Sequence, residues 1–280
     1  MTEIRRHLEM APIGVFDSGM GGLTVVRALR TALPNERFIY LGDTARVPYG
    51  TKSASTVIRY SSQIAAVLLQ RGIKYLVAAC NTASAHALGH LQAQMPVPVM
   101  GVVEPGANVA SVASRRGKIG VIGTRGTINS GAYQVALKRS NPLLEVVGQA
   151  CPLLVPLAEE GWIDHPVTSQ IVAHYLTEIR GKCSDLDTIV LGCTHYPVLR
   201  EVIASQADII FAHPVTLVDS AQTVAEAVKK DLETRGLSFV GQSEEQGAED
   251  LFIFSDTTRF DTVGKIFLGM DIQQAELIDI

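Results

Sequence analysis

The chain has 280 residues, of which 47% are hydrophobic and 19% charged, and its formal net charge is -4. This length and apolar content allow a sizeable core in one large domain or two medium ones. The negative net charge, with Lys and Arg scattered along the chain, argues against nucleic acid as the main partner.

No stretch of the sequence approaches the roughly 18 consecutive apolar residues of a membrane helix, so no membrane association is expected. The first ten residues lack the apolar core of a secretory signal, and we therefore expect a cytoplasmic protein. In that reducing compartment, cysteines without CxxC or Cys/His zinc spacing predict neither disulfides nor a metal site. The cysteines are Cys80, Cys151, Cys183 and Cys193.

Strand-like and helix-like segments alternate along the chain. Short apolar runs between polar or small residues predict buried strands at residues 13–16, 37–41, 75–79, 97–103, 118–122, 144–147, 188–191, 208–211 and 251–254. Apolar residues at helical spacing predict helices over residues 23–33, 53–69, 83–94, 129–138, 167–179 and 221–232. This alternation is typical of βαβ units and predicts an α/β fold with mainly parallel sheets.

An internal repeat divides the chain. Residues 13–19 and 119–125 resemble each other 106 positions apart, and Cys80 and Cys193 lie 113 positions apart. The repeat predicts two similar α/β domains with the active site in the cleft between them. Breaks at Glu104-Pro105-Gly106 and His213-Pro214 place the second domain at residues 105–214 and a discontinuous first domain at residues 1–104 plus 215–280.

Cys80 and Cys193 each follow a predicted strand, at the edge where open α/β sheets bind ligands. Backbone N–H groups at the start of a following helix favour a thiolate there and can bind a substrate carboxylate. Each cysteine precedes a pair of hydrogen-bonding residues, Asn81 and Thr82 in one case and Thr194 and His195 in the other.

Two opposed thiols suit proton transfer at a carbon centre. One thiolate removes a proton while the other thiol delivers a proton to the opposite face, which inverts the configuration. The α proton of an amino acid is weakly acidic, so such a site must exclude water and stabilise the developing charge. A single cysteine acting with His195 would instead suit acyl transfer, but it would leave Cys80 without a task.

The glycine-rich loop that begins at Asp17 matches neither the dinucleotide pattern nor the P-loop pattern. Asp17 can pair with a substrate ammonium group, orient a thiol proton or cap a helix. The loop at residues 47–50 offers the Tyr49 phenol to a ligand or forms an ordinary turn. His195 can hold or protonate Cys193. No lysine or flavin pattern indicates a cofactor, so the predicted chemistry needs none.

These motifs together resemble the glutamate racemases of bacterial cell-wall synthesis. The resemblance spans nearly the whole chain, and the Pro-Tyr-Gly loop and the histidine after Cys193 favour glutamate over the aspartate and hydantoin racemases of the same superfamily. It rests on VFDSG at residues 15–19, VPYG at residues 47–50, ACNTA at residues 79–83 and LGCTHYP at residues 191–197.

The resemblance implies a cofactor-independent interconversion of L- and D-glutamate that supplies D-glutamate for peptidoglycan. Cys80 would act on the α proton of the D-enantiomer and Cys193 on that of the L-enantiomer, with Asp17 and His195 assisting. The implied substrate-binding residues are Asp17, Ser18, Tyr49, Gly50, Asn81, Thr82, Thr194 and His195. Thr124, Thr127, Asp43 and Glu159 match less directly, as a polar loop and auxiliary carboxylates.

Two other classes fit parts of the sequence. A two-lobed amino-acid-binding protein would share the fold, although the paired thiols argue against it. A cysteine hydrolase built on Cys193 and His195 would make Cys80 dispensable. As the assembly we expect a homodimer.

Overall fold

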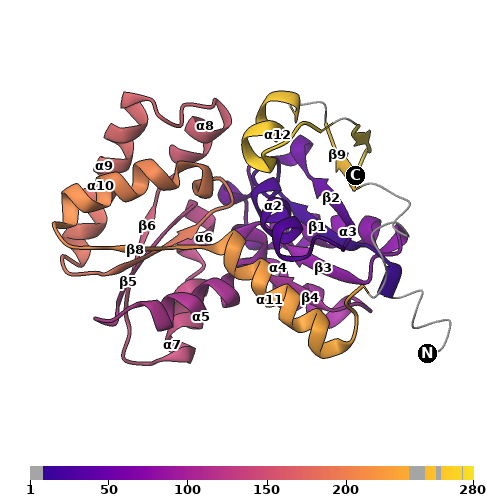
Figure 1. The fold of residues 1–280 in the computed structure, drawn as a ribbon, viewed down its shortest axis with the longest axis horizontal. Coiled ribbons are helices and arrows are strands. Elements are labelled where there is room, and N and C mark those ends of the chain that lie inside the picture. The colour runs from indigo at the N-terminus through magenta and orange to yellow at the C-terminus, as the bar shows by residue number, and fades with distance from the viewer. Residues whose placement is uncertain (1–8, 240–249, 257–259, 273) are drawn as a thin grey trace.

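The computed structural model describes residues 9–239, 250–256, 260–272 and 274–280, and it has two lobes, each built on its own parallel sheet (Figure 1). Residues 1–8, on which the expected absence of a secretory signal depends, lie outside the described residues. The predicted fold class, two α/β units with mainly parallel sheets, is confirmed.

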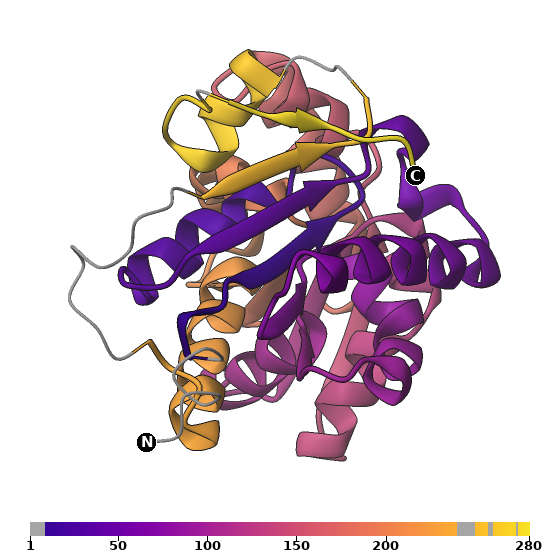
Figure 2. The same cartoon turned by 90° about the vertical axis from the view of Figure 1, so that its right-hand side faces the viewer.

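The first sheet has the strand order β10-β9-β2-β1-β3-β4, and all its pairings are parallel. Figure 2 shows the C-terminal strands, in yellow, at one edge of this sheet. Except for the short edge strand β10, these strands are buried on both faces and are therefore almost continuously apolar. They are β1 (Ile13–Asp17), β2 (Phe38–Gly42), β3 (Tyr75–Ala78), β4 (Val99–Gly101), β9 (Leu251–Phe254) and β10 (Glu276–Leu277).

The second sheet has the order β6-β5-β7-β8 and is also parallel. Its strands are β5 (Lys118–Gly123), β6 (Glu145–Ala150), β7 (Thr188–Gly192) and β8 (Thr216–Asp219). The central strands β1 and β5 are the two copies of the internal repeat, so the repeat in the sequence corresponds to a repeat of structure.

Helices cover both faces of each sheet. On the first sheet, α2 (Leu23–Ala32), α11 (Ser220–Arg235) and α12 (Phe260–Leu268) share one apolar cluster, and α3 (Ala54–Gln70) and α4 (Asn81–Gln94) form the other. On the second sheet, α9 (Pro166–Lys182) and α10 (Arg200–Phe211) cover one face, and α5 (Val103–Ala113) and α7 (Ala132–Ser140) the other. Shorter elements are η1 (Thr44–Arg46), η2 (Tyr49–Thr51), α6 (Arg125–Asn129), α8 (Leu154–Glu159) and η3 (Tyr196–Leu199).

One predicted strand is wrong. Residues 208–211 form the end of α10, and the strand of this region is β8, a few residues later. A short apolar run does not distinguish a strand from a helix. The burial pattern shows the helical period, since Ile203, Ala207 and Phe211 are buried four residues apart while Ile209 is 68% exposed.

Sheet membership bears on where the two units divide. The sequence predicts a return to the first unit at residue 215, but β8 pairs with β7 in the second sheet. Likewise α5, which contains the predicted break at Pro105, packs on the second sheet. Pro105 does not interrupt this helix, because it lies in the first turn, where proline is tolerated. We propose that the second domain spans residues 103–219 and that α11, orange in Figure 1, returns the chain to the first domain.

Candidate functional site

The two lobes enclose a cavity of about 270 Å³ between the carboxyl ends of their strands. Cys80 follows β3 of the first sheet and Cys193 follows β7 of the second, and both line this cavity. A cavity is therefore present between the two lobes, where the sequence predicts the active site. The other lining residues are Ser18, Gly19, Val47, Pro48, Tyr49, Gly50, Asn81, Thr82, Thr124, Val155, Pro156, Glu159, Thr194 and His195.

Cys80 is the N-cap of α4, and its surroundings keep the thiol protonated. Its sulfur accepts a hydrogen bond from the Ala83 amide at 3.4 Å, and its S–H donates to the Ser18 hydroxyl at 3.6 Å. Burial, aided by the negative charge of Asp17, raises the pKa of Cys80 to about 12. The N–H contact at the helix start favours the thiolate, as expected, but burial raises the pKa of Cys80 by more.

Cys193 has a different neighbour. The Cys193 sulfur lies 3.7 Å from His195 Nδ1, and His195 Nε2 lies 2.9 Å from a Glu159 carboxylate oxygen. Burial lowers the pKa of His195, but the hydrogen bonds and negative charges of Cys193 and Glu159 outweigh it and raise this pKa to about 10. His195 is therefore an imidazolium at neutral pH, with its two N–H groups directed at the thiol and the carboxylate.

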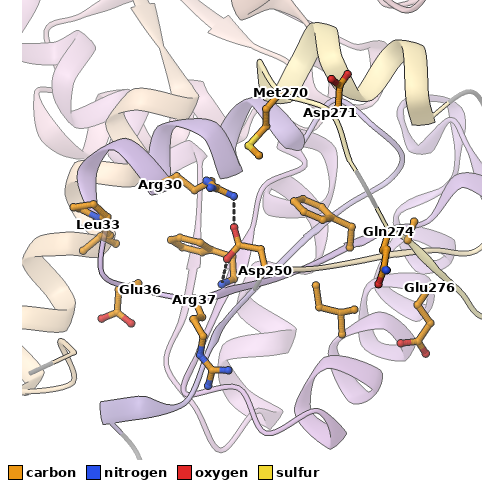
Figure 3. Close-up of a pocket in the computed structure, with 14 residues that line it drawn as sticks. Arg30, Leu33, Glu36, Arg37, Asp250, Met270, Asp271, Gln274 and Glu276 are labelled. Atoms are coloured by element: carbon orange, nitrogen blue, oxygen red, sulfur yellow. Dashed lines mark hydrogen bonds and ion pairs between the residues drawn. The ribbon is translucent and has the colours of Figure 1, made fainter. Parts of the chain in front are cut away.

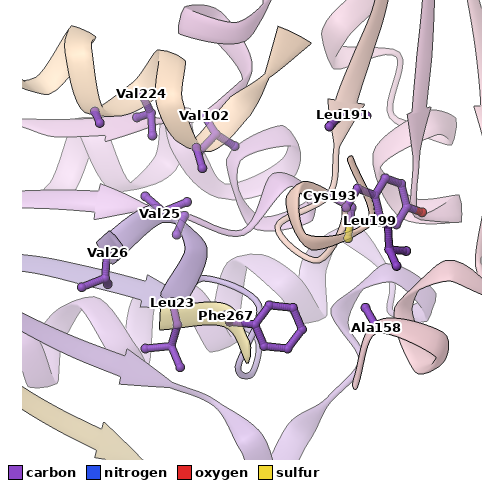
Figure 4. Close-up of a cluster of buried hydrophobic side chains, with 14 of the residues drawn as sticks. Leu23, Val25, Val26, Val102, Ala158, Leu191, Cys193, Leu199, Val224 and Phe267 are labelled. Atoms are coloured by element: carbon purple, nitrogen blue, oxygen red, sulfur yellow. The ribbon is translucent and has the colours of Figure 1, made fainter. Parts of the chain in front are cut away.

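The Cys193 loop differs locally from the Cys80 loop as well. No helix starts directly after Cys193, since the chain first makes a turn and η3 before α10. An apolar cluster lies behind this loop, and Figure 4 shows the Phe267 ring extending from α12 toward the side of Cys193 and Ala158. The Phe267 ring meets the His195 ring edge-on at a centroid distance of 5.1 Å, which fixes the plane of the imidazole.

Three threonine hydroxyls connect the lobes at the cavity. Thr82 of α4 lies 2.9 Å from Thr124 and 3.1 Å from Thr127, measured between hydroxyl oxygens. Thr124 lines the cavity, and Thr127 supports it from behind. Gly50 packs directly on Thr124, because a Cβ at this glycine would come within 2.7 Å of the threonine side chain. Thr124 and Thr127, the two threonines that match the family pattern less directly, therefore both lie at the site.

The two predicted aspartates lie behind the cavity wall. Asp43 is fully buried and accepts a hydrogen bond from the Tyr49 hydroxyl at 2.5 Å, while Arg46 and Ser255 also bond to it. It therefore holds the Tyr49 loop and does not line the cavity. Asp17 is likewise fully buried and accepts from the Gly19 amide at 3.1 Å. Burial raises the pKa of Asp17.

The glycine-rich loop between β1 and α2 packs on the second lobe. A Cβ on Gly21 would come within 2.5 Å of both the His195 ring and the Thr194 hydroxyl, and a Cβ on Gly22 within 2.4 Å of Asp17. Thr24, at the start of α2, donates to the Thr194 carbonyl at 2.9 Å. Gly21 thus allows the close approach of the two lobes, and Gly22 allows the loop to pack on Asp17 within the first lobe.

Comparison with known proteins identifies the family of this chain. The family model described as Asp/Glu/hydantoin racemase matches residues 13–228. A glutamate racemase from Geobacter metallireducens is 52% identical over 257 residues, 92% of each chain, and one from Chlorobaculum tepidum is 45% identical over 96% of each chain. The chain belongs to the Asp/Glu/hydantoin racemase family.

Solved structures give the same result. Glutamate racemase from Francisella tularensis in complex with D-glutamate superposes with a TM-score of 0.87 at 36% identity, over 97% of this chain and 98% of that one. The enzyme from Thermus thermophilus in complex with β-chloro-D-alanine gives 0.84 at 41% identity, with the same coverage. An aspartate racemase from Picrophilus torridus shares the fold alone, with a TM-score of 0.56 at 19% identity. The protein is thus an amino-acid racemase by class.

A larger cavity of about 790 Å³ lies elsewhere on this racemase, at the amino ends of β2 and β9. Figure 3 shows Arg30 from α2 reaching Asp250 there, at 2.5 Å, and Asp250 also accepts from the Phe38 amide at 2.9 Å. Among the described residues that line this cavity, none is a cysteine or a histidine. The smaller cavity is the one lined by Cys80, Cys193 and His195.

Within the part of the chain that the structure describes, no helix of the racemase is both long and apolar enough to span a membrane. The same residues contain no group of three or more His, Cys, Asp or Glu side chains that could hold a metal ion. Sequence reasoning missed Val155 and Pro156 of α8, which line the cavity, and Phe267, which supports His195. Their sequence context has no polar motif to mark them.

Proposed function

We propose that this racemase interconverts L- and D-glutamate without a cofactor, using Cys80 and Cys193 as the two proton-transfer groups. The observation that carries the proposal is that two buried thiols, from equivalent strand ends of the two lobes, line one small cavity. Two lobes with one thiol each can reach the two faces of a single α carbon. The similarity to glutamate racemases selects glutamate as the substrate.

In the proposed reaction from the L-enantiomer, the Cys193 thiolate accepts the α proton and the Cys80 thiol donates its proton to the opposite face. The bond from carbon to hydrogen that breaks on one face is replaced by one on the other, and the two sulfurs exchange protonation states. The high pKa of Cys80 suits its role as the acid in this direction, and the His195 imidazolium supports the negative sulfur of Cys193.

The remaining polar groups of the cavity suit the substrate's charges. Backbone N–H groups at the start of α4 and the hydroxyls of Thr82 and Thr124 can bind carboxylates. The Ser18 hydroxyl beside Cys80 and the Tyr49 phenol can orient the substrate from the opposite wall. Burial of both thiols excludes water, which is required to remove so weakly acidic a proton.

We also propose that the product D-glutamate supplies peptidoglycan synthesis in the cytoplasm. The assignment follows from the glutamate racemase resemblance. A mutant strain that lacks this gene and carries the intact gene on a plasmid should grow, whereas a strain carrying the Cys80→Ser gene should require added D-glutamate. Growth of the latter strain without D-glutamate would contradict the assignment.

The contacts of Cys193 also suit a second function. Cysteine, histidine and carboxylate follow one another at 3.7 and 2.9 Å, which is the order of nucleophile, base and orienting group in cysteine hydrolases. That function would leave Cys80 without a role. An active Cys80→Ala protein that hydrolyses an amide substrate would favour it over the racemase.

Deuterium incorporation at the α carbon of glutamate in heavy water tests the proposal. The wild type should racemise both enantiomers and deuterate the products, and Cys80→Ser and Cys193→Ser should each lose racemisation by about 1,000-fold or more. Cys193→Ser should retain exchange only with D-glutamate, and Cys80→Ser only with L-glutamate. Cys183→Ser, which changes a buried thiol outside the cavity, is the matched control. Exchange with aspartate in place of glutamate would move the substrate within the family.

A further inference from the structure

Tyr133 lies at the contact between the two cysteine loops, although it does not line the cavity. It is the second residue of α7, and its side chain is 1% exposed. Its hydroxyl donates a 2.7 Å hydrogen bond to the side-chain oxygen of Asn81, the residue after Cys80, across the boundary between the lobes. A tyrosine of the second lobe thus holds the cysteine loop of the first.

The same ring contacts the other cysteine loop. A Cβ on Gly192, the residue before Cys193, would lie 3.2 Å from Cε2 of Tyr133. This position has no room for a larger residue without displacement of the ring. On its other side the ring faces Gly106 of α5, where a Cβ would lie 3.4 Å from the phenol oxygen. Tyr133 is therefore packed against the backbone next to one catalytic thiol and bonded to the side chain next to the other.

A chain of hydrogen bonds leads back from Asn81 to the second lobe. The Asn81 amide nitrogen lies 3.5 Å from the Ser220 hydroxyl, which donates to the carbonyl of Leu191 at 3.0 Å. Leu191 is in β7, two residues before Cys193. The Asn81 side chain is thus held at both its oxygen and its nitrogen by groups of the second lobe or its return segment. Burial raises the pKa of Tyr133, so its hydroxyl stays protonated and remains a donor.

We propose that Tyr133 is a positioning residue for racemisation: by joining Asn81 to the Gly192 backbone, it sets the separation of Cys80 and Cys193 across the substrate. The inference rests on the proposed two-thiol function. Proton removal and delivery must occur on opposite faces of one carbon, so both sulfurs have to be placed within a few tenths of an ångström at the same time. Loss of the Tyr133 hydroxyl leaves Asn81 with only the 3.5 Å contact to Ser220 and so loosens this constraint.

The test is Tyr133→Phe, which removes only the hydroxyl. We expect kcat to fall by about tenfold in both directions with little change in KM, because substrate binding is retained while the two thiols lose their alignment. In heavy water, the share of deuterium found in the recovered starting enantiomer should rise relative to that in the product. A merely structural role would not move this ratio.

Tyr75→Phe is the matched control. Tyr75 is also 1% exposed and donates a 2.7 Å hydrogen bond, to Asp231 of α11, but it lies at the amino end of β3 and away from the cavity. This variant should lose thermal stability without a change in kcat or in the deuterium ratio. Ser220→Ala, which breaks the same chain of hydrogen bonds from its other end, should act like Tyr133→Phe and provides the test if that variant does not fold.

The outcomes separate the two proposals. A wild type that does not racemise glutamate overturns the proposed function, whatever the variants do. If the wild type is active, unchanged kcat and deuterium ratio in Tyr133→Phe, or equal losses in Tyr133→Phe and Tyr75→Phe, overturn the positioning role. A fall in kcat with an altered ratio in Tyr133→Phe and Ser220→Ala, but not in Tyr75→Phe, supports it.

Discussion

The two cysteine loops occupy equivalent places in the two lobes, yet their surroundings differ. Cys80 caps a helix, bonds to Ser18 and lies near the carboxylate of Asp17, and its pKa is raised to about 12. Cys193 lies in a turn beside the His195 imidazolium, which Glu159 holds. The repeated fold therefore supplies two thiols, and the side chains around them give one a proton and the other a cationic partner.

This difference makes the resting site asymmetric. If racemisation follows the proposed two-thiol mechanism, the protonated Cys80 is the proton donor and Cys193, beside the His195 cation, is the group that takes a proton from the L-enantiomer. In the proposed mechanism, each turnover in that direction leaves the two sulfurs with exchanged protonation states. In that mechanism, return to the resting state requires a proton to leave Cys193 and another to reach Cys80. His195 is a buried titratable group whose Nδ1 lies 3.7 Å from the Cys193 sulfur, where it can take part in the first of these transfers.

The largest expected effect of the asymmetry is on thiol reactivity. A thiol with a pKa of about 12 has a thiolate fraction on the order of 1 in 10,000 or less near pH 7.5, so Cys80 should react slowly with iodoacetamide. We expect Cys193 to be alkylated about 100-fold faster, as measured by mass spectrometry of the peptides over time. The Cys193→Ser protein serves as the reference for Cys80 alone. Faster labelling of Cys80 in the wild type would reverse the comparison.

The parts of this site that are contiguous in the sequence can be predicted from the sequence alone. The strand end, the cysteine and the polar pair after it are contiguous, so Cys80 with Asn81 and Cys193 with Thr194 are predictable from the pattern alone. The parallel strands before them are predictable for the same reason, since a buried strand needs a continuous apolar run.

The electrostatics of the site depend on distant contacts. The protonated state of Cys80 results from burial, which the expectation of a thiolate at a helix N-terminus did not include. Glu159 reaches His195 across 36 positions of sequence, and Phe267 comes from a helix near the end of the chain. Tyr133 touches both cysteine loops because the start of α7 places its ring against Gly192, the last residue of β7. Such contacts leave no pattern in a single sequence.

Replacing His195 should remove most of the difference between the loops. In His195→Asn the cation beside Cys193 is lost, so we expect kcat to fall by about 100-fold and alkylation of Cys193 to slow, with Cys80 unaffected. Because the equilibrium constant between enantiomers is one, kcat/KM must fall equally in both directions, and steady-state kinetics of both enantiomers check this. The control is His174→Asn, on the exposed face of α9, which should keep full activity. Loss of activity without slower alkylation of Cys193 would assign His195 to substrate binding instead.

The smallest expected effect comes from Glu159, which acts on Cys193 only through His195. In Glu159→Gln the carboxylate that helps to raise the pKa of His195 is lost, while the position keeps a similar shape. Because Glu159 is 42% exposed, solvent screens part of its charge, and we expect kcat to fall by no more than about tenfold. Glu160→Gln is the control, since Glu160 is exposed and does not line the cavity.

The Glu159→Gln substitution should also change how the stability of the fold depends on pH. His195 has a pKa of about 10 in the folded protein, against about 6.5 in an unfolded chain, so its protonation stabilises the fold fully below pH 6.5. That stabilisation is lost as the pH rises from 6.5 through 10. In Glu159→Gln the folded pKa falls, so the loss should be smaller and should finish at a lower pH. Thermal unfolding midpoints from pH 6 to 10 for both proteins measure it. Identical profiles would mean that Cys193 alone keeps His195 protonated and that the Glu159 carboxylate has no part in it. The difference between the two cysteine loops would then rest on His195.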